Sequence, residues 1–279
     1  MRTSSSGGAC ARRTSGSTSS TSGPTTRPES EAFTGPGRCC HARERSCCPT
    51  PLPLRARSAP SARRRSRSGC PRCSSRCSPT ASGQRVALSF DDGPDPAVTP
   101  YVLDALARHG ARATFFSVGR LVEAWPELAR RVAAEGHELG NHSWRHSRWE
   151  PFSTPRAQIA EMERGARAIA AIVGNGVAPL YRAPFGVKSP PFVVAAHTKR
   201  LTMVAWSVHG RDTGGADAEQ IAARVLRRVR PGDIVLLHDG HDRPGEHRTA
   251  CADAVRRILA GLRDRKLECV TVSELIGQS

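Results

Sequence analysis

This 279-residue sequence is poor in apolar side chains. Hydrophobic residues make up 38% of it and aromatic residues only 5%. No stretch approaches the roughly 18 consecutive apolar residues of a membrane-spanning helix, so we expect no transmembrane segment. A G-x-G-x-x-G sequence after the first predicted strand and a P-loop sequence are also missing. Their absence argues against a dinucleotide site and against a P-loop nucleotide site.

The first 84 residues lack nearly everything a folded core requires. They contain no Val, Ile, Trp, Tyr or Lys, and after Met1 their only large apolar side chains are Phe33, Leu52 and Leu54. Burial cannot offset the entropy of ordering such a segment, which predicts a disordered tail over residues 1–84. This tail carries 15 arginines, three glutamates and eight of the ten cysteines. The formal charge of +17 therefore describes a tail and does not make the protein a nucleic-acid binder or a disulfide scaffold.

Three features of the tail allow sharper interpretations. The arginine run at 63–67 could touch an anionic surface, although a solvated charge run is favoured. Cys70, Cys73 and Cys77 have metal-like spacing but need a fourth ligand, such as Cys47 or Cys48. No apolar region follows the early arginines, so no secretory signal is visible. Arg-rich, Lys-free sequence is also what GC-rich DNA yields in a wrong frame, and our hypothesis is a misassigned start.

From Arg85 onward, short apolar runs alternate with amphipathic stretches. Strands are predicted at 86–90, 113–118, 138–142, 180–183, 203–208, 233–238 and 269–272. Helices are predicted at 99–109, 121–135, 154–173, 218–229 and 249–265. Strands that alternate with helices indicate a parallel sheet, so we expect residues 85–279 to form one domain, either an incomplete (β/α) barrel or an open doubly wound sheet.

Polar clusters follow five of these strands. Adjacent carboxylates, Asp91 and Asp92, follow the first strand, where they repel each other unless one holds a cation or a proton. A simple turn is the alternative explanation. His142 and His146 follow the third strand with i, i+4 spacing, which on a helical turn places both imidazoles on one side. One Asp with two His is a common ligand set for a divalent ion with open positions.

The remaining clusters contain Arg182 after the fourth strand, His209 to Asp212 after the fifth and His238 after the sixth. Parallel folds carry their chemistry just beyond the carboxyl ends of the strands. Five polar clusters at one edge of a sheet are far less probable by chance than any single motif.

In these motifs the sequence resembles the polysaccharide deacetylases of carbohydrate esterase family four, over residues 85–276. The resemblance is carried by S-F-D-D-G-P at 89–94, H-S-W-R-H at 142–146, R-A-P-F at 182–185 and L-L-H at 236–238. The fourth motif is partial. The family often shows Asp-x-x-Asp-Trp there, whereas this chain has His209-Gly-Arg-Asp212-Thr213 and keeps only the second Asp. The resemblance and the element count favour a distorted, incomplete (β/α) barrel of about seven units.

The resemblance implies a metal site made by Asp92, His142 and His146. The expected cofactor is a divalent ion, zinc by preference, with Co²⁺ or another divalent ion as alternatives. Three protein ligands leave positions open, as a catalytic zinc site requires. Such an ion polarises the acetamide carbonyl.

The resemblance also implies the proton chemistry. Asp91 would be the general base, and Arg182 would keep it ionised. His238 would be the general acid that protonates the departing amine, with Asp212 orienting it. A backbone N–H near Phe185 would help to hold the oxyanion. The candidate substrate contacts are Trp144, Pro184, Phe185 and Leu236, with Trp149 and Trp206 as further stacking candidates.

The predicted activity is removal of N-acetyl or O-acetyl groups from a polysaccharide such as chitin oligomers or peptidoglycan. Two alternatives stay open: an amidase of the same fold acting on a small cyclic amide or ureide, and a non-catalytic carbohydrate-binding relic. We expect an acetylated saccharide as the partner, no nucleic acid, and a monomer. The resemblance indicates an extracellular, periplasmic or cell-wall location. Cys251 and Cys269 are expected to be buried thiols.

Overall fold

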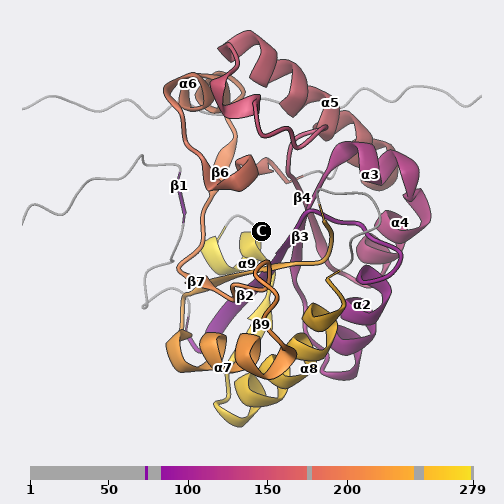
Figure 1. Ribbon diagram of the computed structural model, residues 1–279, viewed down its shortest axis with the longest axis vertical. Coiled ribbons are helices and arrows are strands. Elements are labelled where there is room, and N and C mark those ends of the chain that lie inside the picture. The colour runs from indigo at the N-terminus through magenta and orange to yellow at the C-terminus, as the bar shows by residue number, and fades with distance from the viewer. Residues whose placement is uncertain (1–72, 75–82, 175–177, 242–247, 278–279) are drawn as a thin grey trace, which may run out of the picture. The chain divides into compact units, whose positions relative to one another are not determined.

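A computed structural model describes residues 73–74, 83–174, 178–241 and 248–277 of the chain (Figure 1). The tail predicted for residues 1–84 therefore lies almost wholly outside the described residues, as do the arginine run at 63–67, Cys70 and Cys77. Within this tail the structure describes residues 83–84 and the backbone of Cys73–Ser74, which forms a short strand. Within the described ranges, no helix is both long enough and apolar enough to cross a membrane.

One parallel sheet forms the centre of the domain, and every strand pairing in it is parallel. The strand order is β1-β6-β5-β4-β3-β2-β8-β7, and β9 pairs with β2 beside this path. Among the described strands, the two ends of this order, β1 and β7, are not joined, which confirms the distorted, incomplete barrel. The strands are β1 (Cys73–Ser74), β2 (Arg85–Asp91), β3 (Thr114–Ser117), β4 (Glu138–Asn141), β5 (Leu180–Tyr181), β6 (Thr202–Val204), β7 (Val208–His209), β8 (Ile234–His238) and β9 (Glu268–Val270).

Helices connect these strands and surround the central ones, as Figure 1 shows for α2, α3, α4, α5, α7 and α8. The α-helices are α2 (Thr99–Arg108), α3 (Gly119–Ala124), α4 (Pro126–Ala134), α5 (Pro155–Val173), α6 (Pro190–Thr198), α7 (Ala218–Arg228), α8 (Thr249–Asp264) and α9 (Val272–Ile276). Two 3₁₀ turns, η1 (Glu150–Phe152) and η3 (Pro184–Gly186), lie in the loops.

The structure corrects three expectations about the elements. The helix predicted at 121–135 is two helices, because Trp125 leaves the helical region (φ −129°, ψ 59°) before Pro126, which has no N–H to continue the ladder. The strand predicted at 203–208 is likewise two strands, β6 and β7. Helices α6 and α9 were not predicted, since both are short and follow directly on loop or strand residues.

The core has two layers that follow the alternation of side chains along β2. Val86, Leu88 and Phe90 belong to the large cluster beneath the helices, whereas Ala87 belongs to a second cluster with Phe116. Because side chains alternate between the two faces of a strand, Ser89 and Asp91 point to the same side as Ala87. This side of the sheet therefore changes from apolar to polar toward the carboxyl end of β2. Cys251 and Cys269 are free and buried, as expected.

Candidate active site

The register of the sheet brings the polar strand ends together. Asp91, the last residue of β2, lies directly opposite His238, the last residue of β8. On the other side of β2, the end of β3 pairs with the end of β4 at Asn141, immediately before His142. The carboxyl edge of a parallel sheet thus collects residues that are far apart in the sequence, as the pattern of polar clusters predicts.

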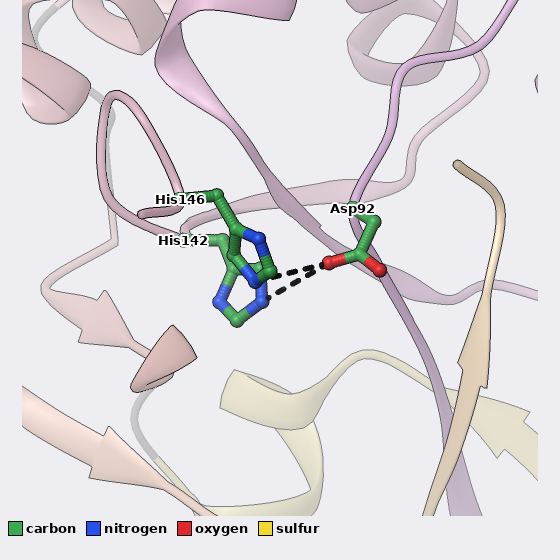
Figure 2. Close-up of side chains that lie close together, drawn as sticks. All are labelled: Asp92, His142 and His146. Carbon is green, nitrogen blue, oxygen red and sulfur yellow. Dashed lines mark ion pairs between the residues drawn. The ribbon is translucent and has the colours of Figure 1, made fainter. Parts of the chain in front are cut away.

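Asp91 and Asp92 are adjacent, but their backbones differ. Asp91 ends the strand, whereas Asp92 has a left-handed conformation with φ 72°. The two carboxylates consequently face different partners. Oδ1 of Asp92 lies 3.5 Å from Nε2 of His142 and 3.3 Å from Nε2 of His146, as the dashed lines of Figure 2 show. Burial raises the pKa of Asp92, but the neighbouring imidazoles of His142 and His146 outweigh it and hold this pKa well below its ordinary value.

The ring of His142 is fixed in the tautomer that a metal requires. Nδ1 donates its hydrogen to the carbonyl oxygen of Arg182 at 2.8 Å, which leaves the lone pair on Nε2 directed at Asp92. Burial lowers the pKa of His142, but the Asp91 and Asp92 carboxylates overcome this effect and raise it. The ligand atoms of Asp92, His142 and His146 all lie within 4.8 Å of one another. One buried carboxylate with two imidazoles is a donor set that fits a divalent ion such as zinc.

The segment that carries the two histidines is not the helical turn expected from their spacing. Ser143 and His146 have φ values of 70° and 56°, which a right-handed helix excludes. Hydrogen bonds replace the helical ladder. The hydroxyl of Ser143 donates to Glu150 at 2.6 Å, and the hydroxyl of Tyr181 donates to the other oxygen of the same carboxylate at 3.2 Å. Burial raises the pKa of Glu150 and outweighs these two bonds.

Arg182 is the largest fully buried side chain in the described part of the domain. Its Nη1 donates to Oδ1 of Asp91 at 2.7 Å and to the hydroxyl of Ser89 at 2.9 Å. Burial is the strongest influence on this guanidinium and lowers its pKa, while Asp91 opposes the change. The structure thus places Arg182 beside Asp91, where the sequence analysis expects it.

Asp212 holds His238 from two directions. Oδ1 of Asp212 accepts a hydrogen bond from Nδ1 of His238 at 2.9 Å, and Oδ2 accepts one from its backbone N–H at 2.8 Å. Burial lowers the pKa of His238, but Asp212 more than compensates, so the pKa is raised. The retained Asp of the partial fourth motif therefore contacts the histidine it was expected to orient.

A cavity of about 300 Å³ opens onto this cluster. Of the candidate substrate contacts, Phe185, Leu236 and Trp206 line it, and the Phe185 ring lies 4.5 Å from the ring of His146. Pro184 is buried in η3 and Trp144 packs beneath Arg164, whose guanidinium carbon lies 3.1 Å from the indole centre. Neither residue is part of the lining. Trp149 is 72% exposed and lines a separate hollow.

Sequence reasoning missed two residues of this region, Arg248 and Glu150, and gave no role to a third, His209. Arg248 precedes α8, and its Nη1 lies 3.1 Å from Oδ2 of Asp92, the oxygen that faces away from the imidazoles. Glu150 supports the histidine segment, and His209 lines the cavity outside any assigned role. Arg248 is one of many arginines and Glu150 sits in an unpatterned loop, so no sequence signal marks either. The departure at His209 from the fourth motif was visible in the sequence.

Comparisons with known proteins agree with this geometry. Residues 78–204 match the family model described as polysaccharide deacetylase. The chitooligosaccharide deacetylase of Bradyrhizobium sp. (strain ANU 289) is 43% identical over 180 residues, covering 63% of this chain and 80% of the relative. A peptidoglycan-N-acetylglucosamine deacetylase of Bacillus cereus is 36% identical over 193 residues, covering 68% and 87%. The structure is similar to the family 4 carbohydrate esterase from Streptomyces lividans, with a TM-score of 0.61, 30% identity and coverage of 71% and 97%.

Proposed function

The chain belongs to the polysaccharide deacetylase family, and from that premise we propose that it hydrolyses the acetamide groups of N-acetylglucosamine units with the help of a divalent metal ion. One observation carries the proposal. Asp92, His142 and His146 offer ligand atoms within 4.8 Å of one another, between a buried Asp91–Arg182 ion pair and the Asp212–His238 pair. The site thus joins a metal ligand set to one candidate base and one candidate acid.

Asp92, His142 and His146 would hold the ion, and zinc suits their nitrogen and oxygen donors best. A divalent ion at this position supplies Lewis-acid chemistry, which polarises the acetamide carbonyl and makes a water molecule more acidic. The carbonyl oxygen of Arg182 contributes by keeping Nε2 of His142 free of a proton. Arg248 contributes by taking up the second oxygen of Asp92, so that Oδ1 alone faces the imidazoles.

Asp91 accepts the proton of the attacking water in this proposal. Its Oδ1 is bound by Arg182, while Oδ2 lies 3.6 Å from Nε2 of His142 on the side of the metal ligands. The buried guanidinium of Arg182 thus holds the Asp91 carboxylate in place, with Oδ2 turned toward the ligands. The backbone N–H of Phe185, at the rim of the cavity, is the proposed donor to the oxyanion.

His238 donates a proton to the sugar nitrogen as the carbon–nitrogen bond breaks. An amine leaves poorly without protonation, so this step requires an imidazolium at neutral pH. Asp212 supports that form, because its carboxylate faces Nδ1 and leaves the Nε2 proton to the cavity. The products are acetate and a free amino sugar.

Chitin oligomers and peptidoglycan are the proposed substrates. One matching relative is a chitooligosaccharide deacetylase and another is a peptidoglycan-N-acetylglucosamine deacetylase, and each match covers most of the domain. Phe185, Trp206 and Leu236 supply apolar surface for a sugar ring. A peptidoglycan substrate would place the protein outside the cytoplasm. A monomer remains our prediction.

The activity test is acetate release from chitin oligomers and from peptidoglycan, with zinc or cobalt added and with a chelator added. We expect release from at least one polymer and none after chelation. Ring opening of a small cyclic amide, with no acetate released from either polymer, would support the amidase alternative. No release from any substrate, with metal bound, would support the carbohydrate-binding relic.

Two variants separate the metal site from the base. Asp91→Asn should lower kcat by at least about 100-fold, the range of general-base catalysis, while zinc still binds. His142→Ala should lose zinc itself, measured by metal analysis after dialysis. His197→Ala, at an exposed position of α6, is the matched control and should retain both properties. Full activity of Asp91→Asn would exclude Asp91 as the base.

A further inference from the structure

Besides His238 and the two candidate metal ligands His142 and His146, one further imidazole lines the cavity. His209 ends β7 and lines the cavity together with Trp206 and His238. Its ring centre lies 6.1 Å from that of His238 and 5.9 Å from that of Trp206, to which it stands nearly perpendicular at 86°. The chemistry proposed above uses His238 and leaves His209 without a role.

The backbone determines the tautomer of His209. The N–H of Arg211 donates to Nδ1 of His209 at 2.8 Å, so Nδ1 is an acceptor and carries no hydrogen. Arg211 has φ 54°, and this turn brings its N–H back to the ring. A neutral His209 therefore carries its hydrogen on Nε2. Among the residues that the structure describes, none accepts a hydrogen bond from this nitrogen.

The imidazoles of His238 and His209 have opposite electrostatic surroundings. Nδ1 of His238 faces the Asp212 carboxylate, which favours the charged ring. Nδ1 of His209 faces an N–H group, which favours the neutral ring. Burial and the nearby charge of His238 accordingly lower the pKa of His209, whereas that of His238 is raised. Paired titratable groups pushed apart in this way divide a task, here proton donation for His238 and hydrogen bonding for His209.

We propose that His209 is a substrate-contacting residue that donates a hydrogen bond from Nε2 to a hydroxyl or ring oxygen of the sugar whose acetamide reacts. A neutral N–H suits a neutral sugar oxygen, and Trp206 keeps the ring in its plane. His209 then sets the affinity for the saccharide and takes no part in proton transfer. This inference rests on the proposed deacetylase function.

The test compares His209→Phe, which keeps a ring and removes the donor, with His209→Gln, which keeps an N–H donor. His209→Phe should raise KM for a chitin oligomer roughly 2- to 12-fold, as expected for one neutral hydrogen bond. Its kcat should stay within about twofold of the unaltered chain, because the bond is made equally before and during reaction. The Kd of the deacetylated oligomer, measured by calorimetry on the zinc-loaded protein, should rise by the same factor. His209→Gln should recover part of both losses.

The matched control is His197→Phe on α6, which should leave KM, kcat and Kd unchanged. An unchanged KM and Kd in His209→Phe would overturn the inference while the deacetylase function stands. Equal losses in His209→Phe and His209→Gln would also overturn it, since a purely structural role predicts them. A collapse of kcat at constant KM would contradict a binding role as well. If the unaltered chain released no acetate from any saccharide, the proposed function and this inference would fall together.

Discussion

Asp91 and Asp92 show how two identical side chains acquire different tasks. Their backbones diverge because Asp92 adopts φ 72°, so Asp91 meets a buried guanidinium and Asp92 meets two imidazoles. Each carboxylate is thus compensated by its own partners, and their mutual repulsion is offset. Roles in this site follow from surroundings, as they do for the two imidazoles His209 and His238.

The Asp212–His238 pair leads to a prediction about pH. As the proposed general acid, His238 can donate its proton only while charged. Asp212 raises the pKa of His238, so activity should persist above the ordinary histidine range and fall as pH rises through the raised value. Asp212→Asn keeps an oxygen acceptor but removes the charge. The basic limb of kcat/KM should therefore move to lower pH by about one unit, the difference between a charged and a neutral hydrogen bond. A pH–rate profile measures this shift.

The control for this profile is Asp264→Asn, which removes one exposed carboxylate at the end of α8 and should leave both limbs in place. A basic limb that does not move in Asp212→Asn would show that Asp212 does not govern the proton on His238.

Sequence reasoning found the residues that belong to short motifs and missed those that arrive by tertiary packing. Asp91, His142, Arg182 and His238 lie within recognisable patterns at strand ends. Arg248 reaches Asp92 across 156 residues of sequence, and nothing in its neighbourhood distinguishes it from other arginines. Contacts of this kind depend on tertiary packing, which local sequence patterns do not encode.

Among the elements, α5 supports the metal site most directly. The helix packs against the residues at the start of the histidine segment. The side-chain amide of Asn141 donates a hydrogen bond to the carbonyl oxygen of Met162 at 2.7 Å. A Cβ added at Gly165 would overlap Oδ1 of Asn141 and lie 3.0 Å from the carbonyl oxygen of Ser143. Glycine at this position therefore allows the close approach of helix and loop.

Gly165→Ala is expected to disturb the site from outside. Alanine favours a helix by about 1 kcal/mol over glycine, but overpacking against backbone costs about 1–3 kcal/mol, so the free energy of unfolding should change little or fall by up to about 2 kcal/mol. Zinc affinity should fall by at least about 10-fold, because the histidine segment must move. Urea unfolding and competition with a zinc chelator measure the two quantities.

Gly214→Ala provides the comparison, since a Cβ there meets nothing within 4 Å and its backbone needs no left-handed conformation. Both quantities should match those of the unaltered chain. Unaltered zinc affinity in Gly165→Ala would mean that α5 does not position the ligands.

The bounds of a helix or strand could be predicted where capping residues or prolines mark them in the sequence. The predicted bounds of α5 agree with the structure within one residue, helped by Thr154 as the N-cap and Pro155 at the first position. The expectation of a helical turn for the histidine segment was wrong. Two histidines with i, i+4 spacing can equally lie in a loop, here one with left-handed residues at Ser143 and His146. That conformation depends on Glu150 and Tyr181, which lie outside the motif.

For the molecule as a whole, the candidate metal ligands come from two strands that are not paired directly with each other. Asp92 follows β2, whereas His142 and His146 follow β4, two strands away in the order of the sheet. An ion bound by all three should therefore stabilise the folded chain. At a zinc concentration 100-fold above Kd, linkage predicts an increase of about 2.7 kcal/mol in the free energy of unfolding.

Urea unfolding of the full chain, with and without zinc, measures this increase. His142→Ala should lose most of it, whereas His197→Ala on α6 should keep it. An equal increase in His142→Ala would place the stabilising ion elsewhere.

The pairing of Asp91 with His238 has a consequence for how this protein could diversify. The proposed proton acceptor and proton donor occupy directly paired positions on two neighbouring strands, about 4.8 Å apart in the hydrogen-bonding direction, so their spacing is built into the sheet. A slip of one residue would turn either group to the opposite face. In the proposed function, by contrast, the saccharide would contact side chains carried by loops, such as Phe185. Insertions in those loops could retune which polymer is accepted while the reaction centre keeps its dimensions.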